Sequence, residues 1–140
     1  MPRVVGLDVG DATIGVAVSD ELGLTAQGLG VIRRSELASD LTELEKLVSP
    51  YSPERFVVGL PLNMNGTVGV QAKKVQAFTE TLERHFGVPV ETWDERLTTV
   101  AASRALGEAH LTRARRRRAI DKVAAVLILQ GYMDRWRSTS

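Results

Sequence analysis

Residues 4–19 have the sequence VVGLDVGDATIGVAVS, which is two short apolar runs joined by a turn at Gly10 and Asp11. Each run has the length and the β-branched content of a strand, so the sequence predicts strands over 3–9 and 13–19. A third run, 29–34, follows the turn-rich stretch 22–28. Three short strands with brief connections predict an antiparallel meander.

After residue 34 the apolar residues recur at helical spacing, and short strand-like runs separate the helical stretches. Serines, a threonine, glycines and prolines mark the ends of these stretches. The predicted elements are a helix capped by Ser35 or Ser39 and ending near Val48, a strand at 55–60, a helix at 67–86, a strand at 89–93, a helix at 98–106 and a final helix at 119–136.

A meander followed by alternating helices and strands is typical of an α/β fold with a five-stranded mixed sheet. We expect the first strand to be central, the two later strands to run parallel to it, and helices to cover both faces. With 140 residues and no repeat or linker, the chain is expected to form one domain over residues 1–140.

The composition excludes several classes of site. The chain has no cysteine, so disulfides, thiolate zinc sites and cysteine nucleophiles are absent, and two histidines are too few for a histidine-rich metal site. No apolar run approaches the ~18–20 residues of a membrane span, and the first residues do not form a signal peptide. We therefore expect a cytoplasmic protein with no membrane partner.

Positive charge is concentrated in one segment. Residues 104–118 carry six arginines and one acid, for a charge of +5, whereas the rest of the chain sums to −4. The segment is either a solvated charge run or a contact for a polyanion such as nucleic acid, whose phosphates would be bound with strong salt dependence. The candidate phosphate-binding residues are Arg113, Arg115, Arg116, Arg117 and Arg118.

Two acidic residues occupy positions where apolar residues are expected. Asp8 lies at the end of the first strand, which we expect to be buried on both faces, unless it is a turn residue before Gly10. Asp121 lies on the same helical stripe as Ala124, Ala125 and Ile128, which directs it toward the sheet. The alternative for Asp121 is an acid that stabilises a helix N-terminus.

A third candidate acid, Glu95, follows the strand at 89–93 directly after Asp94. Functional groups of open α/β sheets gather at such carboxyl ends, although an acidic pair there is also common in solvated loops. Asp8, Glu95 and Asp121 together would repel one another unless a cation joins them. Carboxylates without cysteine or a histidine cluster favour Mg²⁺ or Mn²⁺, and such ions support hydrolysis of phosphodiester bonds.

The segment 59–67 begins at a strand end and leads toward a helix. Backbone amides of Gly66 and Thr67 are candidates to bind a phosphate, with Asn63 and Asn65 adding neutral hydrogen bonds. The alternative is a plain turn in which Thr67 caps the helix. Arg96, beside Glu95, is expected either to contact the scissile phosphate or to pair with Asp94.

Four blocks of the chain resemble the RuvX/YqgF family of Holliday-junction-resolvase-like proteins, also described as pre-16S rRNA nucleases. They are Leu7-Asp8-Val9-Gly10 continuing through Asp20, Gly59-Leu60-Pro61-Leu62-Asn63-Met64-Asn65-Gly66-Thr67, Asp94-Glu95-Arg96-Leu97-Thr98-Thr99, and Ile120-Asp121-Lys122-Val123-Ala124-Ala125. The resemblance implies an RNase H-like fold and a divalent-metal nuclease whose catalytic and metal-binding acids match Asp8, Glu95 and Asp121. Ala124 stands where the related resolvases have a second aspartate, which implies three ligands rather than four.

The resemblance implies maturation of the 5′ end of precursor 16S rRNA, with precursor rRNA or ribosomal precursor particles as partners. Endonuclease activity on branched DNA uses the same residues and stays open, and a homodimer would suit a two-fold junction. A non-catalytic RNA-binding module for ribosome assembly is a further alternative. Asp8 with Gly10, Ile14 and Gly15 also resembles the phosphate hairpin of actin-like ATPases, but those need two such domains, and this chain has one.

Overall fold

The structure of the chain is a computed structural model that describes residues 2–97 and 113–139, without the side chains of 113–121, 138 and 139. The strands are β1 (Val4–Val9), β2 (Thr13–Ser19), β3 (Ala26–Arg33), β4 (Arg55–Leu60) and β5 (Val90–Asp94). The helices are α1 (Leu37–Val48), α2 (Val70–Phe86) and α4 (Arg113–Thr139), with the 3₁₀ turns η1 (Ser49–Tyr51) and η2 (Glu95–Leu97).

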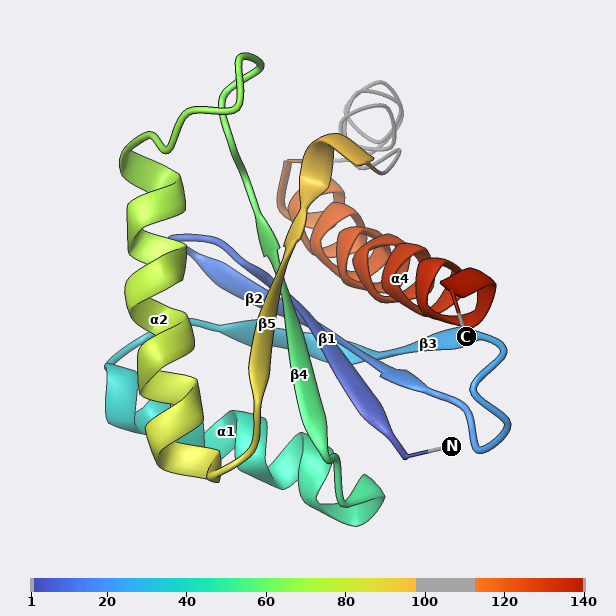
Figure 1. Ribbon diagram of the computed structural model, residues 1–140. Helices are drawn as coiled ribbons and strands as arrows, with labels where there is room; N and C mark the ends of the chain where they lie inside the picture. The colour runs from blue at the N-terminus through green and yellow to red at the C-terminus, as the bar shows by residue number, and fades with distance from the viewer. Residues whose placement is uncertain (1, 98–112, 140) are drawn as a thin grey trace.

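The five strands form one mixed sheet in the order β3-β2-β1-β4-β5 (Figure 1). β1 pairs antiparallel with β2, and β2 pairs antiparallel with β3, which confirms the meander. β4 pairs parallel with β1, and β5 pairs parallel with β4. The carboxyl ends of β1, β4 and β5 therefore meet at one edge of the sheet, as expected.

Helices cover both faces, with α1 and α2 on one side and α4 on the other (Figure 1). Alternate residues of β1 divide between the two cores: Val5 and Leu7 pack under α1 and α2, and Val4 packs under α4. Gly6 also faces α4, where an added Cβ would lie 2.6 Å from Leu129 Cβ. The helix therefore approaches the central strand closely because that strand carries no side chain there.

Several predicted boundaries are corrected. The third strand starts at Ala26 instead of Leu29, because its glycine-rich first half still pairs with β2. Neither Ser35 nor Ser39 caps α1, whose N-cap is Glu36 without a side-chain bond. α2 begins at Val70 rather than Thr67, with Gly69 as N-cap in an extended conformation. Thr67 is therefore not a helix cap.

Residues 113–118, which carry five of the arginines, are part of α4, whereas the sequence pattern predicted that the final helix starts only at Ala119. Arginine has a high helix propensity, so the helix continues back through this stretch. The predicted helix at 98–106 lies outside the described residues. Within the described parts of the chain, no helix is both long enough and apolar enough to span a bilayer.

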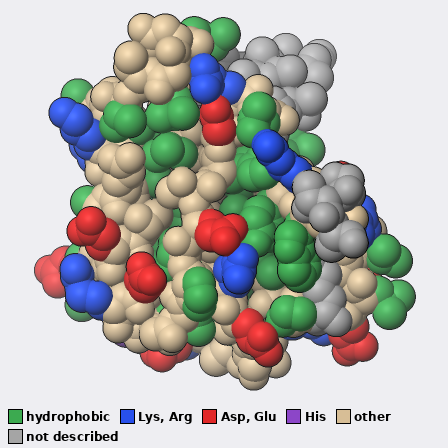
Figure 2. Space-filling model, in the orientation of Figure 1, with side chains coloured by type: hydrophobic (Ala, Val, Ile, Leu, Met, Phe, Trp, Pro, Cys, Tyr) green, Lys and Arg blue, Asp and Glu red, His purple; other side chains and the backbone are tan. Residues whose placement is uncertain are grey.

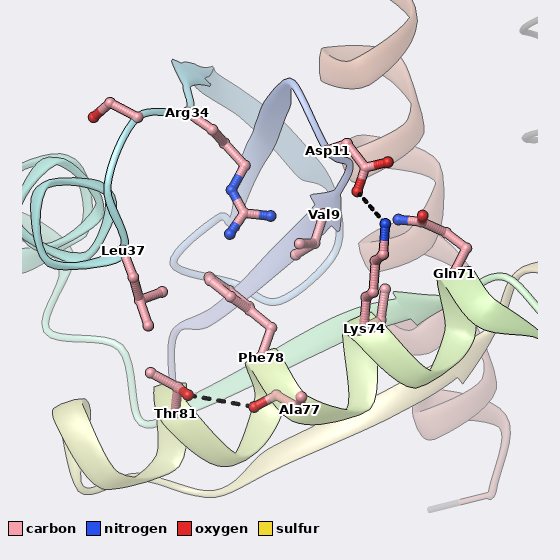
Figure 3. A pocket seen from close by; sticks show the side chains of 11 residues that line it. Val9, Asp11, Arg34, Leu37, Gln71, Lys74, Ala77, Phe78 and Thr81 are labelled. Carbon is pink, nitrogen blue, oxygen red and sulfur yellow. Dashed lines mark hydrogen bonds and ion pairs between the residues drawn. The ribbon is translucent and has the colours of Figure 1, made fainter.

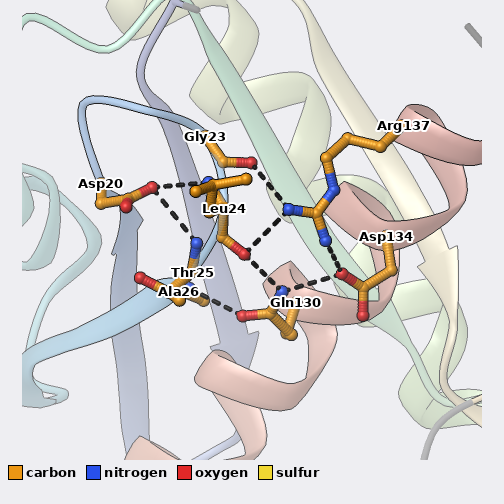
Figure 4. A network of polar contacts seen from close by, with 8 residues as sticks. All are labelled: Asp20, Gly23, Leu24, Thr25, Ala26, Gln130, Asp134 and Arg137. Carbon is orange, nitrogen blue, oxygen red and sulfur yellow. Dashed lines mark hydrogen bonds and ion pairs between the residues drawn. The ribbon is translucent and has the colours of Figure 1, made fainter.

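A polar network ties the β2–β3 hairpin to α4 (Figure 4). Gln130 accepts a hydrogen bond from the Ala26 amide at 2.8 Å and donates one to the Leu24 carbonyl at 3.0 Å. Arg137 donates to the same carbonyl and pairs with Asp134. The end of α4 is thereby held over β3 by backbone partners as well as by apolar packing.

Candidate active site

Asp8 is a buried carboxylate on the central strand. It is 5% exposed and shares its face of β1 with Val4 and Gly6, so it lies on the side of the sheet that α4 covers. Its cross-strand partner is Gly15 on β2, which leaves the neighbouring surface free of a large side chain. A turn residue would be exposed, so the alternative of a simple turn acid is wrong for Asp8.

Glu95 reaches the same face from the end of β5. It is the first residue of η2, and its Oε1 atom lies 2.7 Å from the position that a Cβ on Gly59 would occupy. β4, which carries Gly59, lies between β1 and β5 in the sheet. The absence of a side chain at Gly59 therefore makes the room that the Glu95 carboxylate fills.

Asp8 and Glu95 line one cavity of about 220 Å³ at the carboxyl ends of the parallel strands. Asp11, Pro61 and Gln71 contribute to the same walls. The structure thus brings together two predicted ligands that are far apart in sequence. Among the side chains it describes, no three His, Asp or Glu residues gather closely enough to hold a metal ion. The side chain of the third predicted ligand, Asp121, lies outside that set.

Residue 121 itself falls in α4, three and four positions before Ala124 and Ala125. Both alanines are buried against the sheet, and so is Ile128, one helical turn further on. The described members of the predicted stripe, Ala124, Ala125 and Ile128, are therefore buried as expected. The side chains of Arg113, Arg115, Arg116, Arg117 and Arg118 also lie outside the described set, although their backbone is helical.

The loop after β4 uses its polar groups internally. The Gly66 amide donates to the Asn63 carbonyl at 2.8 Å, and the Thr67 amide donates to Asn65 Oδ1 at 3.1 Å. Asn63 Nδ2 donates to Thr67 Oγ1 at 2.9 Å, and Gly66 has a φ of +85°, which favours glycine. The two amides expected to bind a phosphate already have partners in the loop.

Arg96 pairs with Asp94, which is one of the two expected arrangements. Its Nη2 lies 2.8 Å from Asp94 Oδ2, and its Nη1 donates to the Met64 carbonyl at 3.1 Å. The hydrogen bonds from Arg96 lower the pKa of the Asp94 carboxyl below its usual 3.8, while the same bonds raise the pKa of Arg96. Arg96 thus anchors the 63–67 loop to the end of β5, and Asp94 is engaged by Arg96 at the rim of a separate cavity.

The substitution Asp94→Asn is expected to loosen this loop. Because the pKa of Asp94 is lowered in the folded state, its charge stabilises that state above pH about 4, and the contribution disappears as the pH falls through the lowered value. Amide exchange at Gly66 should be several-fold faster in the variant at pH 7, and the difference should disappear only as the pH falls below 3.8 through the lowered pKa of Asp94. Glu91→Gln is the control: Glu91 lies on the same strand as Asp94 and pairs with Arg55 of β4, and its substitution should leave amide exchange at Gly66 unchanged.

Three features of the site were missed by sequence reasoning. Asp11 and Gln71 line the cavity, and Gly59 gives Glu95 its space. Gly59 stands at the end of a predicted buried strand, but nothing in the sequence says which side chain would lie above it. Figure 2 shows acidic and basic side chains interspersed on one face of the described part of the chain, without a patch of one sign.

Comparison with known proteins by sequence identifies the family of this chain. A family model described as "RuvX: Holliday junction resolvase" matches residues 2–135. A relative from Moorella thermoacetica is 61% identical over 95% of this chain and 95% of its own length, and one from Symbiobacterium thermophilum is 60% identical over 94% and 92%; both are named as pre-16S rRNA nucleases.

The fold is similar to that of solved RuvC structures, which are RNase H-like. Thermus thermophilus RuvC in complex with a Holliday junction substrate superposes with a TM-score of 0.63 at 16% identity, covering 100% of this chain and 98% of that one. A second RuvC structure from the same organism has a TM-score of 0.55 at 18% identity, over 98% and 97%. The RNase H-like expectation is therefore confirmed, and the chain belongs to the RuvX family.

Proposed function

We propose that this protein is a nuclease that hydrolyses phosphodiester bonds at the 5′ end of precursor 16S rRNA, in the cytoplasm. The observation that carries the proposal is the shared cavity of Asp8 and Glu95, two acids separated by most of the chain. Relatives at about 60% identity are named for this activity, and they match nearly the full length of the chain. Precursor rRNA is accordingly the proposed substrate, free or within ribosomal precursor particles.

A divalent cation, Mg²⁺ or Mn²⁺, is proposed to bind at Asp8, Glu95 and Asp121. The donor set fits such a cation because carboxylate oxygens are the ligands that hard ions prefer, and the described walls of the cavity carry no sulfur or imidazole. When bound, the cation supplies Lewis-acid stabilisation of the charge that develops on the scissile phosphate.

The residues of the chain position the reacting groups. Asp8 lies on a central strand that pairs with β2 on one side and β4 on the other. The sheet, rather than a loop, therefore holds the backbone that carries its carboxylate. Glu95 is seated over Gly59. In the proposal, phosphates flanking the cleaved bond contact the arginines at 113 and 115–118. Asn63, Asn65 and Thr67 exchange their hydrogen bonds within the loop for bonds to the nucleic acid, while Arg96 supports the loop through the Met64 carbonyl.

Cleavage of branched DNA is the second candidate, and the description of the matching family model as a Holliday junction resolvase favours it. The catalytic residues would be the same, because phosphate contacts do not distinguish RNA from DNA and only contacts to the 2′-hydroxyl do. A homodimer would present two such sites to a two-fold junction.

The test compares both substrates with purified full-length protein. We expect cleavage of a precursor 16S rRNA fragment in Mn²⁺ or Mg²⁺, none with a chelator, and little cleavage of a four-way DNA junction. The triple variant Asp8→Asn, Glu95→Gln, Asp121→Asn should be inactive. Processing that persists in this variant would contradict the nuclease and support an RNA-binding assembly module. Cleavage of the junction alone would favour the second candidate.

A further inference from the structure

A second cavity, of about 520 Å³, adjoins the active-site cavity. Figure 3 shows the side chains that line it. The two cavities share Val9, Asp11 and Gln71 in their walls. Val9 points away from α4 because it follows Asp8 on β1, so the second cavity opens on the α1 and α2 side of the sheet. A chain that leaves Asp8 past Asp11 and Gln71 would enter this cavity.

Arg34 projects into this cavity in a fixed orientation (Figure 3). Its Nε donates to Asp40 Oδ2 at 3.2 Å, its Nη1 donates to the Gly10 carbonyl at 2.9 Å, and its Cζ lies 5.2 Å from the centre of the Phe78 ring. Asp40 is 2% exposed and also accepts the Ser35 amide, so it lies behind the guanidinium. Among the described residues, Nη2 of Arg34 has no hydrogen-bond partner.

Lys74 supplies a second cation from α2. Its Nζ lies 3.3 Å from Asp11 Oδ1, but both side chains are more than half exposed, so the pair is weak and its ammonium can turn to another anion. Gln71, one helical turn earlier on α2, lines both cavities. Its side-chain carboxamide has no hydrogen-bond partner in the described part of the chain. Donors from α2 thus mark the path between the cavities.

The remaining wall is apolar and includes Val9, Leu37 and Phe78. An apolar wall combined with two cations suits a nucleotide, which combines the apolar face of its base with an anionic phosphate. The volume is within the range of small-molecule sites, which is about 300–1,000 Å³. An acidic peptide could also pair with the two cations, but its binding would not explain why this cavity shares wall residues with the active-site cavity.

We propose that this cavity binds a nucleotide of the substrate strand next to the cleaved bond, with its phosphate held by Arg34 and Lys74. The inference rests on the proposed function, because it takes the strand in the active-site cavity to be nucleic acid. It adds two positioning residues that lie on the opposite side of the sheet from α4 and its arginines. The strand would then cross the sheet edge at Gly10 and Asp11.

Binding of a single-stranded RNA to the Lys74→Gln variant tests this, in an Asp8→Asn background that prevents cleavage. The matched control is Lys73→Gln, because Lys73 is the neighbouring exposed lysine on α2 and does not line the cavity. Lys74→Gln should raise the Kd of a fluorescent 12-nucleotide RNA about fivefold. The slope of log Kd against log salt should fall by about 0.7, the value for one phosphate of a single strand. Lys73→Gln should change neither.

Arg34→Lys is the second variant. It keeps a positive charge that can pair with the buried Asp40 carboxylate, but it removes the Nη2 group that is proposed to bind the phosphate. It should weaken binding of the same RNA by a similar factor, with the unfolding temperature monitored as a check on the fold. Equal affinities for Lys74→Gln and Lys73→Gln would overturn the inference while leaving the nuclease intact. If the Asp8→Asn parent itself binds no RNA, the proposed RNA substrate fails together with this inference.

Discussion

Asp8→Asn is expected to lower the cleavage rate by about 10³-fold or more while RNA binding is retained or improved. The substitution keeps the shape of the side chain but removes one of the negative charges that would hold the divalent cation. A bound cation stabilises the transition state by several kcal/mol. Because each 1.36 kcal/mol changes the rate tenfold, loss of the cation lowers the rate by orders of magnitude. Binding should not suffer because one anion leaves a site that receives phosphate.

Single-turnover cleavage and binding of the same RNA, each measured with the wild type and the variant, check this result. Glu43→Gln is the control, since Glu43 is an exposed acid on α1, on the opposite side of the sheet from Asp8. It removes the same charge and should leave the rate unchanged. A variant that loses binding and cleavage in parallel would contradict a role for Asp8 in holding the ion.

Gly59→Ala is expected to lower the cleavage rate about 100-fold, while the free energy of unfolding falls by only about 1 kcal/mol. The added Cβ would lie 2.7 Å from Glu95 Oε1 and 2.4 Å from Ile128 Cδ1, so both side chains must move. Glu95 is only partly buried and can turn away, but a displacement of about 1 Å at a catalytic group can cost ~10²-fold. Ile128 is fully buried, and relieving its overpacking should cost about 1 kcal/mol, the low end of the usual range.

Gly30→Ala is the matched control for this prediction. Gly30 also lies within a strand, but an added Cβ there would meet Leu47 at 3.9 Å, an ordinary contact distance. Cleavage rates and thermal unfolding of the two variants are to be compared. If Gly59→Ala retains the wild-type rate, the seating of Glu95 over Gly59 has no catalytic role. If the two variants lose stability equally, the close contact with Ile128 is not the cause.

Most of the fold could be predicted from local patterns. The strand at 13–19 and the strand at 55–60 match the observed bounds, since each is a short apolar run between turn residues. Two boundaries failed for different reasons. β3 extends through glycines because another strand, β2, pairs with them, and that pairing is not a property of the glycines themselves. α2 starts late because Thr67 bonds to Asn65 within the loop instead of capping the helix, and the sequence had left both arrangements open.

Strand alternation and helical spacing are local properties of the chain, and they were enough to predict the five-stranded mixed sheet and the acids to be considered; the resemblance of four sequence blocks pointed to the family. The packed structure was needed to show that Asp8 and Glu95 line one cavity, that Arg96 anchors the 63–67 loop through Asp94, and that Arg34 and Lys74 line an adjoining cavity. These relations depend on which strands are neighbours and on the space that Gly59 leaves, and both arise from packing between segments that are distant along the chain.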